Sequence, residues 1–369
     1  MTKRKTPSKA KPAFPAPKSL IRPLVHGLHA YVPGEQPKVR GLIKLNTNEH
    51  ALSPSDAVMT AISAVQGEQL RRYPDPDASG LCDAIAAVEG LTAGCVFPGN
   101  GSDEVLAHLW FAFLSGRTVR TLDTTYGFYP VWAKLYGSQL VEVPVLEDFS
   151  VDIAALDQSH DAIVLANPNA PTGLALRRAD IESLVASNRD RLVIIDEAYY
   201  GFGAESAAPL VAEYDNLMIS RSLSKSHALA GMRVGYALAH PDLIEGLNRV
   251  KDSFNSYPLD AVAQAAATAA ISDAEWFEQA SQTVAQSRAQ LTEGLGSLGF
   301  QVLPSMANFV FTRHPEVGGE ALFAALRQEG VLVRRWSKPR IEDWLRITVG
   351  SGGQNECLLA TVAQFLKNQ

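Results

Sequence analysis

The feature that most constrains the fold is a series of short apolar runs separated by stretches of helical composition. The runs cover residues 119–122, 162–166, 192–195, 217–219 and 234–239. Continuous apolar runs are typical of strands buried on both faces, and their alternation with helices indicates a mostly parallel, doubly wound sheet. We therefore predict an α/β protein whose large domain covers residues 51–255.

A second, smaller unit is predicted after this domain. The alanine-rich stretch 259–271 and the segment 275–298 have the composition of long helices. They lead into a C-terminal α/β domain, for which we predict the bounds 256–369. We expect the segment 22–50 to join this smaller domain, and a chain of 369 residues is long enough for both units.

The N-terminal residues differ in composition from the rest. Residues 1–34 hold seven basic residues, six prolines and no acidic residue, which predicts an extended arm, assigned to residues 1–21. The arm lacks the apolar region of a secretory signal, while an organellar transit peptide stays open as an alternative. Without these seven charges the formal net charge falls from −6 to −13, so we expect no nucleic-acid partner.

Composition also bears on the compartment and on membranes. The chain is 46% hydrophobic and 20% charged, which is ordinary for a globular enzyme, and no stretch approaches the length of a membrane span. Cys82, Cys95 and Cys357 have no CxxC spacing, which indicates a reducing compartment without disulfides or a zinc site. We expect a cytoplasmic protein with no membrane partner and no metal.

Asp196 directly follows the apolar run 192–195. Open α/β sheets bind ligands at the carboxyl ends of their strands, so this carboxylate is placed where a ligand is expected. If the ligand contains a pyridine ring, a carboxylate there can keep the ring nitrogen protonated. Tyr199, three residues further on, is a candidate for a hydrogen bond to a phenolic oxygen of such a ligand.

The segment 221–236 combines one amine with hydroxyls and a guanidinium. Lys225 lies among Ser222 and Ser224, and Arg233 follows eight residues later. A lysine can form a Schiff base with a carbonyl, while hydroxyls and a guanidinium bind a dianionic phosphate through charge-assisted hydrogen bonds. This combination predicts pyridoxal 5′-phosphate (PLP) as the cofactor.

A possible phosphate cradle precedes an apolar helix face. Gly101 and Ser102 come just before Val105, Leu106 and Leu109, and backbone N–H groups at a helix start attract phosphate. The alternative is an ordinary N-cap, which is the commoner reason for such residues at this position. It is no dinucleotide fingerprint, because a glutamate stands in place of the third glycine.

These motifs, in this order, resemble the class I/II aminotransferases of fold type I, and most of all the histidinol-phosphate aminotransferases of histidine biosynthesis. The resemblance runs from about residue 31 to residue 350. It is carried by residues 44–49, 72–76, 99–104, 125–129, 167–173, 196–199, 222–236, 308–309 and 345–350.

The resemblance implies a role for each candidate residue. Lys225 would form the Schiff base, and Asp196 and Tyr199 would hold the ring nitrogen and the phenolic oxygen. Tyr126 would stack on the ring, and Tyr73 would reach the phosphate bound by a neighbouring subunit, which implies a homodimer with shared active sites. The phosphate would be held by Gly101, Ser102, Ser222 and Arg233, with Ser224 beside them.

One turn departs from the family pattern. The family has Asn-Asn-Pro-Thr-Gly, whose second asparagine binds the phenolic oxygen, whereas this chain has Asn169-Ala170-Pro171-Thr172-Gly173. Ala170 cannot donate that hydrogen bond. Either Asn169 is re-aimed to replace it, or Tyr199 alone supports the oxygen.

Three residues are candidates for the substrate. Arg346 lies in the apolar strand pattern 344–349, where an arginine needs an anionic partner: a substrate carboxylate or a buried structural ion pair. The resemblance adds Arg334 and Tyr31 to the same pocket, where an arginine fork suits both carboxylate and phosphate.

The function implied is ping-pong transamination between a small-molecule amino donor and a keto acid, with histidinol phosphate and 2-oxoglutarate as the expected pair. An aromatic amino acid is the alternative substrate. A PLP-dependent decarboxylase of phosphorylated amino acids and a non-catalytic sensor domain are the competing functions.

Overall fold

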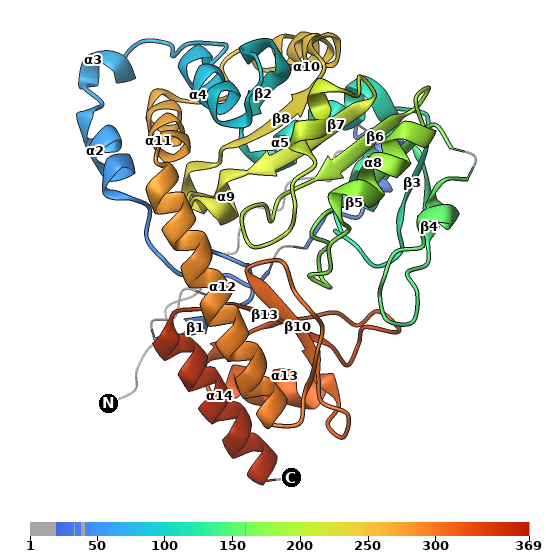
Figure 1. The fold of residues 1–369 in the computed structure, drawn as a ribbon, viewed down its shortest axis with the longest axis vertical. Helices are drawn as coiled ribbons and strands as arrows, with labels where there is room; N and C mark the ends of the chain where they lie inside the picture. The colour runs from blue at the N-terminus through green and yellow to red at the C-terminus, as the bar shows by residue number, and fades with distance from the viewer. Residues whose placement is uncertain (1–19, 33, 38–40, 159, 369) are drawn as a thin grey trace, which may run out of the picture.

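A computed structural model describes residues 20–32, 34–37, 41–158 and 160–368 of the chain. Figure 1 shows a large sheet with helices around it and a smaller sheet below, joined by one long helix, α12. The helices are α1 Pro23–His26, α2 Asp56–Ala64, α3 Gly67–Leu70, α4 Ser79–Glu89, α5 Gly101–Leu109, α6 Tyr129–Tyr136, α7 Ile153–Leu156, α8 Arg178–Ser187, α9 Leu223–Ser226, α10 Pro241–Phe254, α11 Ala261–Ser272, α12 Ala274–Ser297, α13 Gly319–Gln328 and α14 Gly352–Lys367. A π-helical stretch, Trp110–Leu114, extends α5, and 3-10 turns cover Ala93–Cys95, Ala208–Ala212 and Ala230–Met232.

The large sheet has seven strands in the order β2-β8-β7-β6-β5-β3-β4. Its strands are β2 Val96–Gly99, β3 Thr118–Leu122, β4 Gln139–Val143, β5 Ala162–Ala166, β6 Leu192–Asp196, β7 Leu217–Ser222 and β8 Gly235–Ala239. Neighbours from β4 through β7 pair in parallel, whereas β8 runs antiparallel to both β7 and β2. The predicted α/β fold with a mostly parallel sheet is confirmed.

Two hydrophobic cores cover the two faces of this sheet. Along β5, Ile163 and Leu165 belong to one core, whereas Ala162 and Val164 belong to the other. This alternation is the period of two expected of a strand whose side chains point to opposite faces. Helices α4, α8 and α11 contribute to the first core, and α5, α6 and α10 contribute to the second. The continuous apolar runs in the sequence reflect burial on both faces.

The smaller sheet has four antiparallel strands in the order β12-β13-β10-β9. Its strands are β9 Gln301–Val302, β10 Phe309–Arg313, β12 Arg334–Arg335 and β13 Leu345–Thr348, and a separate parallel pair joins β1 Ile43–Lys44 to β11 Val331–Leu332. Helices α12, α13 and α14 pack on this sheet around a third hydrophobic core. The pairing of β1 with β11 links part of the segment 22–50 to the strand that follows α13, and the assignment of this segment to the smaller domain stays a prediction.

Helix α11 packs differently from the expectation. Ala263, Ala266 and Ala270 of α11 belong to the core shared with α2 and α4, next to the large sheet. The predicted boundary after residue 255 placed α11 in the smaller unit, because its composition resembles that of the following helix. Its small alanine side chains instead let it lie close to α2 and α4, so we propose a division at the junction of α11 and α12.

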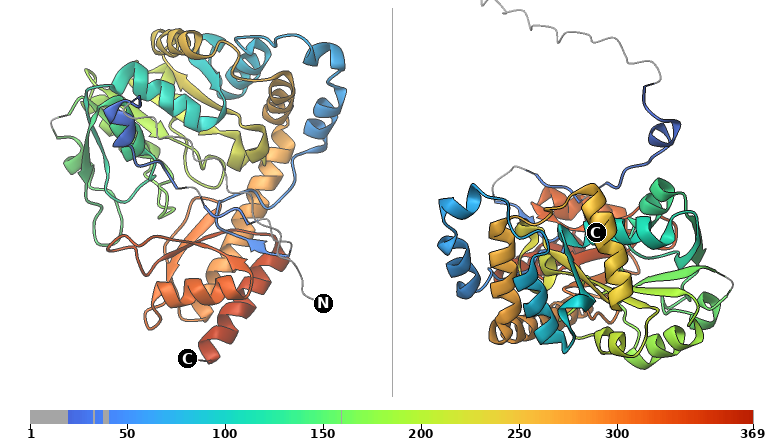
Figure 2. Two further views of the ribbon diagram at one scale, coloured as in Figure 1. Left: turned by 180° about the vertical axis from the view of Figure 1, so that it is seen from behind. Right: turned by 90° about the horizontal axis from the view of Figure 1, so that it is seen from above.

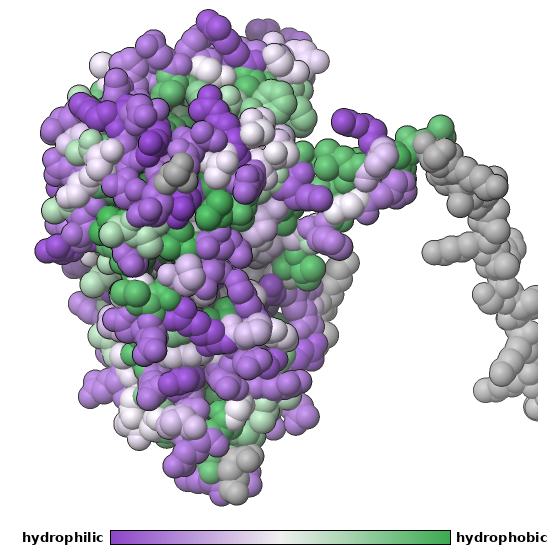
Figure 3. Space-filling model, turned by 90° about the vertical axis from the view of Figure 1, so that its right-hand side faces the viewer, coloured by the Kyte–Doolittle hydropathy of each residue, from purple (hydrophilic) through white to green (hydrophobic). Residues whose placement is uncertain are grey.

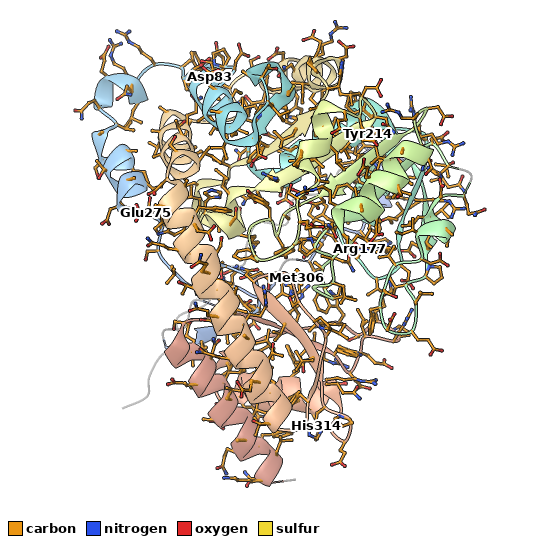
Figure 4. All side chains as sticks on the ribbon, in the orientation of Figure 1. Asp83, Arg177, Tyr214, Glu275, Met306 and His314 are labelled. Atoms are coloured by element: carbon orange, nitrogen blue, oxygen red, sulfur yellow. The ribbon has the colours of Figure 1, made fainter. Side chains whose placement is uncertain are left out.

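The two sheets meet along one seam. Met306, which Figure 4 labels between them, donates its backbone N–H to the carbonyl of Gly173 at 2.8 Å. Lys338 donates to the carbonyl of Asp123, and the Arg340 guanidinium donates to the carbonyl of Val145 at 2.7 Å. These contacts tie segments around the smaller sheet to loops of the large one. No helix in the described part of the chain combines the length and apolarity needed to cross a bilayer.

The segment before β1 begins outside the body of the protein. Figure 2 (right) shows α1 standing clear of the rest, and none of its residues is buried. Leu20, Ile21 and Val25 are exposed on this segment, which carries hydrophobic residues in Figure 3. A helical turn at Pro23–His26 follows the predicted arm, and proline at the first helical position favours helix initiation there. Residues 1–19 of the predicted arm lie outside the described residues.

Candidate active site

A cavity of about 330 Å³ lies at the seam between the two sheets. Its walls come from the carboxyl ends of the large-sheet strands, from the smaller sheet and from N-terminal residues at 31, 34, 36, 46, 47 and 49. The predicted site residues that line it are Tyr31, Ser102, Tyr126, Asp196, Tyr199, Ser222, Ser224, Lys225, Arg233, Arg334 and Arg346. Side chains that are far apart in the sequence therefore meet in one place.

Lys225 lies in α9, the single helical turn after β7. The turn is capped by Ser222, whose Oγ accepts the backbone N–H of Ser224 at 3.2 Å. Lys225 Nζ donates to the carbonyl of Thr47 at 2.8 Å. Burial lowers the pKa of this amine to about 8, and the charge of Arg346 acts in the same direction. At neutral pH a substantial fraction of the amine is therefore uncharged and nucleophilic.

Asp196 ends β6 and is only 3% exposed. Its Oδ2 accepts a hydrogen bond from the Tyr129 hydroxyl at 2.9 Å, whereas Oδ1 has no partner among the described residues. Burial raises the pKa of Asp196 to about 7, which the Tyr129 hydrogen bond partly opposes. A buried carboxylate oxygen without a partner needs a donor, and a protonated ring nitrogen is such a donor.

Tyr129, in the motif 125–129, is a core aromatic and is also the residue that orients Asp196. Its ring packs between Trp110 and Trp132 with no exposure, and its hydroxyl is the donor to the carboxylate. Sequence reasoning missed the second role because the two residues are 67 positions apart.

Gly101 and Gly235 bring α5 against β8. A Cβ at Gly235 would lie 2.3 Å from the backbone nitrogen of Ser102, and one at Gly101, whose φ is +80°, would lie 2.5 Å from Arg233 Nη2. Only glycine fits such close approaches. The Arg233 guanidinium contacts Ser224 Oγ at 3.3 Å and Asp103 Oδ2 at 3.2 Å. The start of α5, the guanidinium and the serine hydroxyls thus converge, as expected of a phosphate site.

Tyr126 lies on the cavity wall in an aromatic cluster. Its hydroxyl donates to Asp103 Oδ1 at 3.0 Å, which fixes the ring, and burial raises its pKa well above the usual value. Tyr31 packs 4.9 Å from the Phe128 ring and 6.1 Å from the Tyr126 ring. The N-terminal segment therefore reaches the cavity, as predicted.

Tyr199 faces the same cavity, and its hydroxyl oxygen accepts the side-chain amide of Asn48 at 2.8 Å. Burial raises the pKa of this phenol, and the Arg346 charge and the Asn48 hydrogen bond oppose the increase. Asn48 was part of the motif 44–49 but had no predicted role.

Asn169 does not replace the contact that Ala170 lacks. Its amide nitrogen donates to the carbonyl of Thr124 at 2.9 Å and to Thr172 Oγ1 at 3.1 Å, and its Oδ1 accepts the Thr125 hydroxyl at 2.7 Å. Both amide hydrogens are therefore used, one within the turn and one on the loop after β3, and Asn169 is not among the residues lining the cavity. The expectation that Asn169 is re-aimed at the cofactor is not supported, because its hydrogen-bonding capacity is spent on shaping the loop.

Arg346 and Arg334 lie side by side on β13 and β12. Arg346 Nη2 donates to the carbonyl of Asn46 at 3.2 Å, and its Nε is buried without a hydrogen-bond partner. Among the described residues no carboxylate lies within 4 Å of its guanidinium, so the structure contains no buried ion pair for Arg346. Arg334 donates to the carbonyl of Val32 at 3.1 Å.

Tyr73 differs from the other predicted site residues in its exposure and in its position outside the cavity. It is 81% exposed, stacks on Tyr257 with 4.6 Å between ring centroids, and does not line the cavity of its own chain.

The site also contains polar residues that sequence reasoning did not single out. Asn46, Thr47 and Glu49 belong to the quoted motif 44–49, and Asp103 follows Ser102 in the cradle. Glu49 accepts hydrogen bonds from Lys44 and Thr47. The runs of polar residues at 46–49 and 102–104 were the signal that could have identified them.

Comparison with known proteins decides the family. The family model for aminotransferases of class I and II matches residues 40–363 of the sequence. This chain belongs to the class I and II aminotransferases. Enzymes of this class depend on PLP, so the predicted family, cofactor and type of reaction are confirmed.

Relatives of this aminotransferase cover nearly its whole length. Histidinol-phosphate aminotransferase 1 of Bradyrhizobium diazoefficiens is 53% identical over 345 residues, covering 93% of this chain and 98% of the relative. The histidinol-phosphate aminotransferase of Gluconacetobacter diazotrophicus is 51% identical over 342 residues, covering 92% and 96%.

Solved structures show the same fold. A putative histidinol-phosphate aminotransferase from Erwinia carotovora atroseptica superposes with a TM-score of 0.83 at 27% identity, covering 92% of this aminotransferase and 99% of that chain. The histidinol-phosphate aminotransferase of Sinorhizobium meliloti, solved in complex with PLP, has a TM-score of 0.85 at 23% identity, with 97% and 99% covered.

Proposed function

We propose that this chain is a histidinol-phosphate aminotransferase, which transfers an amino group between histidinol phosphate and 2-oxoglutarate by ping-pong transamination. The observation that carries the proposal is the cavity itself. It combines the amine of Lys225, the unpartnered carboxylate oxygen of Asp196 and the unpartnered guanidinium nitrogen of Arg346. Relatives at 51–53% identity carry the name of this enzyme.

The residues present fit PLP. Bound PLP would supply an aldehyde for covalent attachment and an electron-poor ring that stabilises charge at the substrate α-carbon. We assign Asp196 Oδ1 to the ring nitrogen, the Tyr199 hydroxyl to the phenolic oxygen and the Tyr126 ring to the cofactor face. The phosphate is assigned to the convergent set Gly101, Ser102, Ser222, Ser224 and Arg233.

Lys225 has two tasks in this proposal. The uncharged form of its amine is the site of covalent attachment, and after release the same amine carries the proton between the substrate α-carbon and the cofactor. The carbonyl of Thr47, 2.8 Å from Nζ, gives the free amine a fixed position at the cavity wall. One side chain thereby serves as anchor and as general acid/base.

Arg346 and Arg334 are assigned to the anionic ends of the substrates. Glutamate carries a carboxylate where histidinol phosphate carries a phosphate, and a guanidinium can bind either anion with two parallel hydrogen bonds. Tyr31 lies at the same end of the cavity, within the aromatic group of Tyr126 and Phe128. We expect this group to contact the imidazole or the aromatic part of the substrate.

We also propose a homodimer in which Tyr73 binds the phosphate in the partner's site. Its exposure and its exclusion from the cavity of its own chain support this role. The test is complementation, because a Lys225→Ala chain mixed with a Tyr73→Phe chain forms hybrid dimers with one intact site. Activity should reappear on mixing, and a fully active monomer at nanomolar concentration would contradict the dimer.

A cytoplasmic location is part of the proposal. Cys82, Cys95 and Cys357 are all free thiols, as expected in a reducing compartment. Fractionation of cells should find the protein with cytoplasmic markers, and recovery from an organelle would favour a transit function for the arm.

The deciding experiment compares substrates. The PLP enzyme should convert glutamate to 2-oxoglutarate in a half-reaction without releasing CO₂, and its kcat/KM for histidinol phosphate should exceed that for phenylalanine and tyrosine. Preference for phenylalanine or tyrosine would reassign the enzyme to aromatic amino acids. Release of CO₂ from a phosphorylated amino acid would reassign it to decarboxylation.

A further inference from the structure

Asn48 lies directly behind Tyr199, with its side chain 1% exposed and outside the cavity lining. Its Nδ2 donates to the Tyr199 hydroxyl oxygen at 2.8 Å, although the two residues are 151 positions apart. A phenol oxygen that accepts this hydrogen bond has its own hydrogen available for another acceptor. Because Tyr199 borders the cavity, that acceptor can be a group bound there.

The direction of the Asn48 amide is fixed by its neighbours. The backbone N–H of Asn48 donates to Thr348 Oγ1 at 3.0 Å, and the Thr348 hydroxyl donates in turn to Asn48 Oδ1 at 3.1 Å. Since Oδ1 is the acceptor of this pair, Nδ2 must point at Tyr199. The Asn308 amide also donates to the Asn48 carbonyl at 2.9 Å. Asn48 itself has a φ of +55°, a conformation that asparagine tolerates better than most residues.

Around Tyr199, Asn48 is the residue whose side-chain amide donates a hydrogen bond to the phenol. Ala170 packs in the same small apolar cluster as Tyr199 and borders the cavity with a methyl group. Asn169, the adjacent amide, spends both hydrogens on Thr124 and Thr172. The support that a second amide could give directly at position 170 is therefore absent.

We propose that Asn48 is a positioning residue that aims the Tyr199 hydroxyl hydrogen at the phenolic oxygen of PLP, with Thr348 holding the Asn48 amide in register. The inference rests on the proposed function, because it needs the Tyr199 contact to PLP. It adds a relay from β13 through the segment 44–49 to the cofactor, in which Thr348 and Asn48 act without touching the cofactor.

The test measures PLP binding to the apoenzyme and the pH midpoint of the absorbance change of the lysine-bound cofactor. Asn48→Gly suits the positive φ and removes the amide without adding charge. It should weaken PLP binding about tenfold, the size expected for one hydrogen bond to an anionic oxygen. The pH midpoint should rise as in Tyr199→Phe, because a phenolic oxygen that loses a donor holds the neighbouring proton more tightly.

The double variant Asn48→Gly/Tyr199→Phe should match Tyr199→Phe alone, because the amide acts through the phenol. Thr348→Val should shift the midpoint in the same direction by less, and it keeps the inference testable if Asn48→Gly does not fold. Asn216→Gly is the matched control. Asn216 directly precedes β7, at the opposite end of that strand from Ser222, and its buried side-chain amide donates to three backbone carbonyls. It should lower the melting temperature and leave the midpoint unchanged.

Two results would overturn the inference. If Tyr199→Phe shifts the midpoint while Asn48→Gly and Thr348→Val do not, or if the shifts add in the double variant, Asn48 does not act through Tyr199. If Tyr199→Phe itself changes neither binding nor midpoint, the proposed Tyr199 contact is wrong and the role of Asn48 fails with it.

Discussion

Asp196 and Glu197 are adjacent carboxylates at the end of β6, 3% and 2% exposed, yet their surroundings differ completely. Glu197 is saturated: its oxygens accept hydrogen bonds from Arg221, from the Ser206 hydroxyl and from the backbone of Ala207. Asp196 keeps one oxygen without a described partner at the cavity wall. Neighbouring positions of one strand thus separate a structural carboxylate from one available to a ligand.

Two arginines show the same difference. Arg221 pairs with Glu89 and Glu197, and its guanidinium lies 3.6 Å from the centre of the Tyr200 ring. Arg346 has carbonyl and ring neighbours, a buried Nε without a partner and no carboxylate partner among the described residues. Unused hydrogen-bonding capacity in a charged group therefore distinguishes the site from the structural ion pairs beside it. Neither burial nor charge alone makes this distinction.

The carboxylate pair gives the largest expected effect. Asp196→Asn should fold normally and lose at least about 10³-fold in kcat/KM, or about 4 kcal/mol of barrier, because an amide cannot keep the ring nitrogen protonated. Glu197→Gln should instead destabilise the fold by about 3 kcal/mol, since it leaves the Arg221 charge less compensated. Steady-state kinetics and denaturant unfolding of both variants check this, and an Asp196→Asn enzyme within about tenfold of wild type would make that carboxylate structural.

The arginine pair should divide in the same way. Arg221→Met should reduce the free energy of unfolding by about 3–5 kcal/mol by stranding two buried carboxylates, with partial recovery in Arg221→Lys. Arg346→Met should change stability by less than about 1 kcal/mol and raise KM for glutamate roughly 30-fold or more, through loss of about 2 kcal/mol of charge-assisted binding. Equal losses of stability in both variants would erase the distinction.

Two lysines sharpen the comparison further, with a smaller effect. Lys251 is held by Asp77, Asp252 and the carbonyl of Pro76, whereas burial and the charge of Arg346 lower the pKa of Lys225 to about 8. Because only the neutral amine attacks, the rate of PLP attachment to the apoenzyme should increase roughly tenfold from pH 7 to pH 9 and then level off. A rate that keeps increasing beyond pH 10 would mean that Lys225 has an ordinary pKa. Stopped-flow absorbance gives the rates directly.

Sequence alone placed the residues whose position follows from a single strand. Asp196 and Lys225 come at the carboxyl ends of β6 and β7, where a parallel sheet gathers its ligands, and the apolar runs marked those strands. A charge inside an apolar strand marked Arg346 as a candidate for binding an anion, and among the described residues it has no carboxylate partner.

Contacts between distant segments could not be predicted in this way. Tyr129 bonds to Asp196 and Asn48 to Tyr199 across 67 and 151 positions, and no local pattern encodes such pairs. The side-chain amide of Asn169 is engaged because the loop after β3 brings the carbonyl of Thr124 to 2.9 Å from the amide nitrogen, a contact that the local sequence does not encode. Alanine composition indicates a helix without saying what it packs against, so the contacts of α11 with α2 and α4 could not be predicted.

The central claim is that PLP binds covalently to Lys225, in the cavity whose charged groups have unused hydrogen-bonding capacity, and to no other lysine. The most direct measurement is reduction of the PLP-loaded enzyme with borohydride, followed by proteolysis and mass spectrometry. We predict one reduced PLP adduct, on the peptide that contains Lys225, and none in a Lys225→Ala control. An adduct on the peptide of Lys251 or of any other lysine, or full activity in Lys225→Ala, would contradict the account.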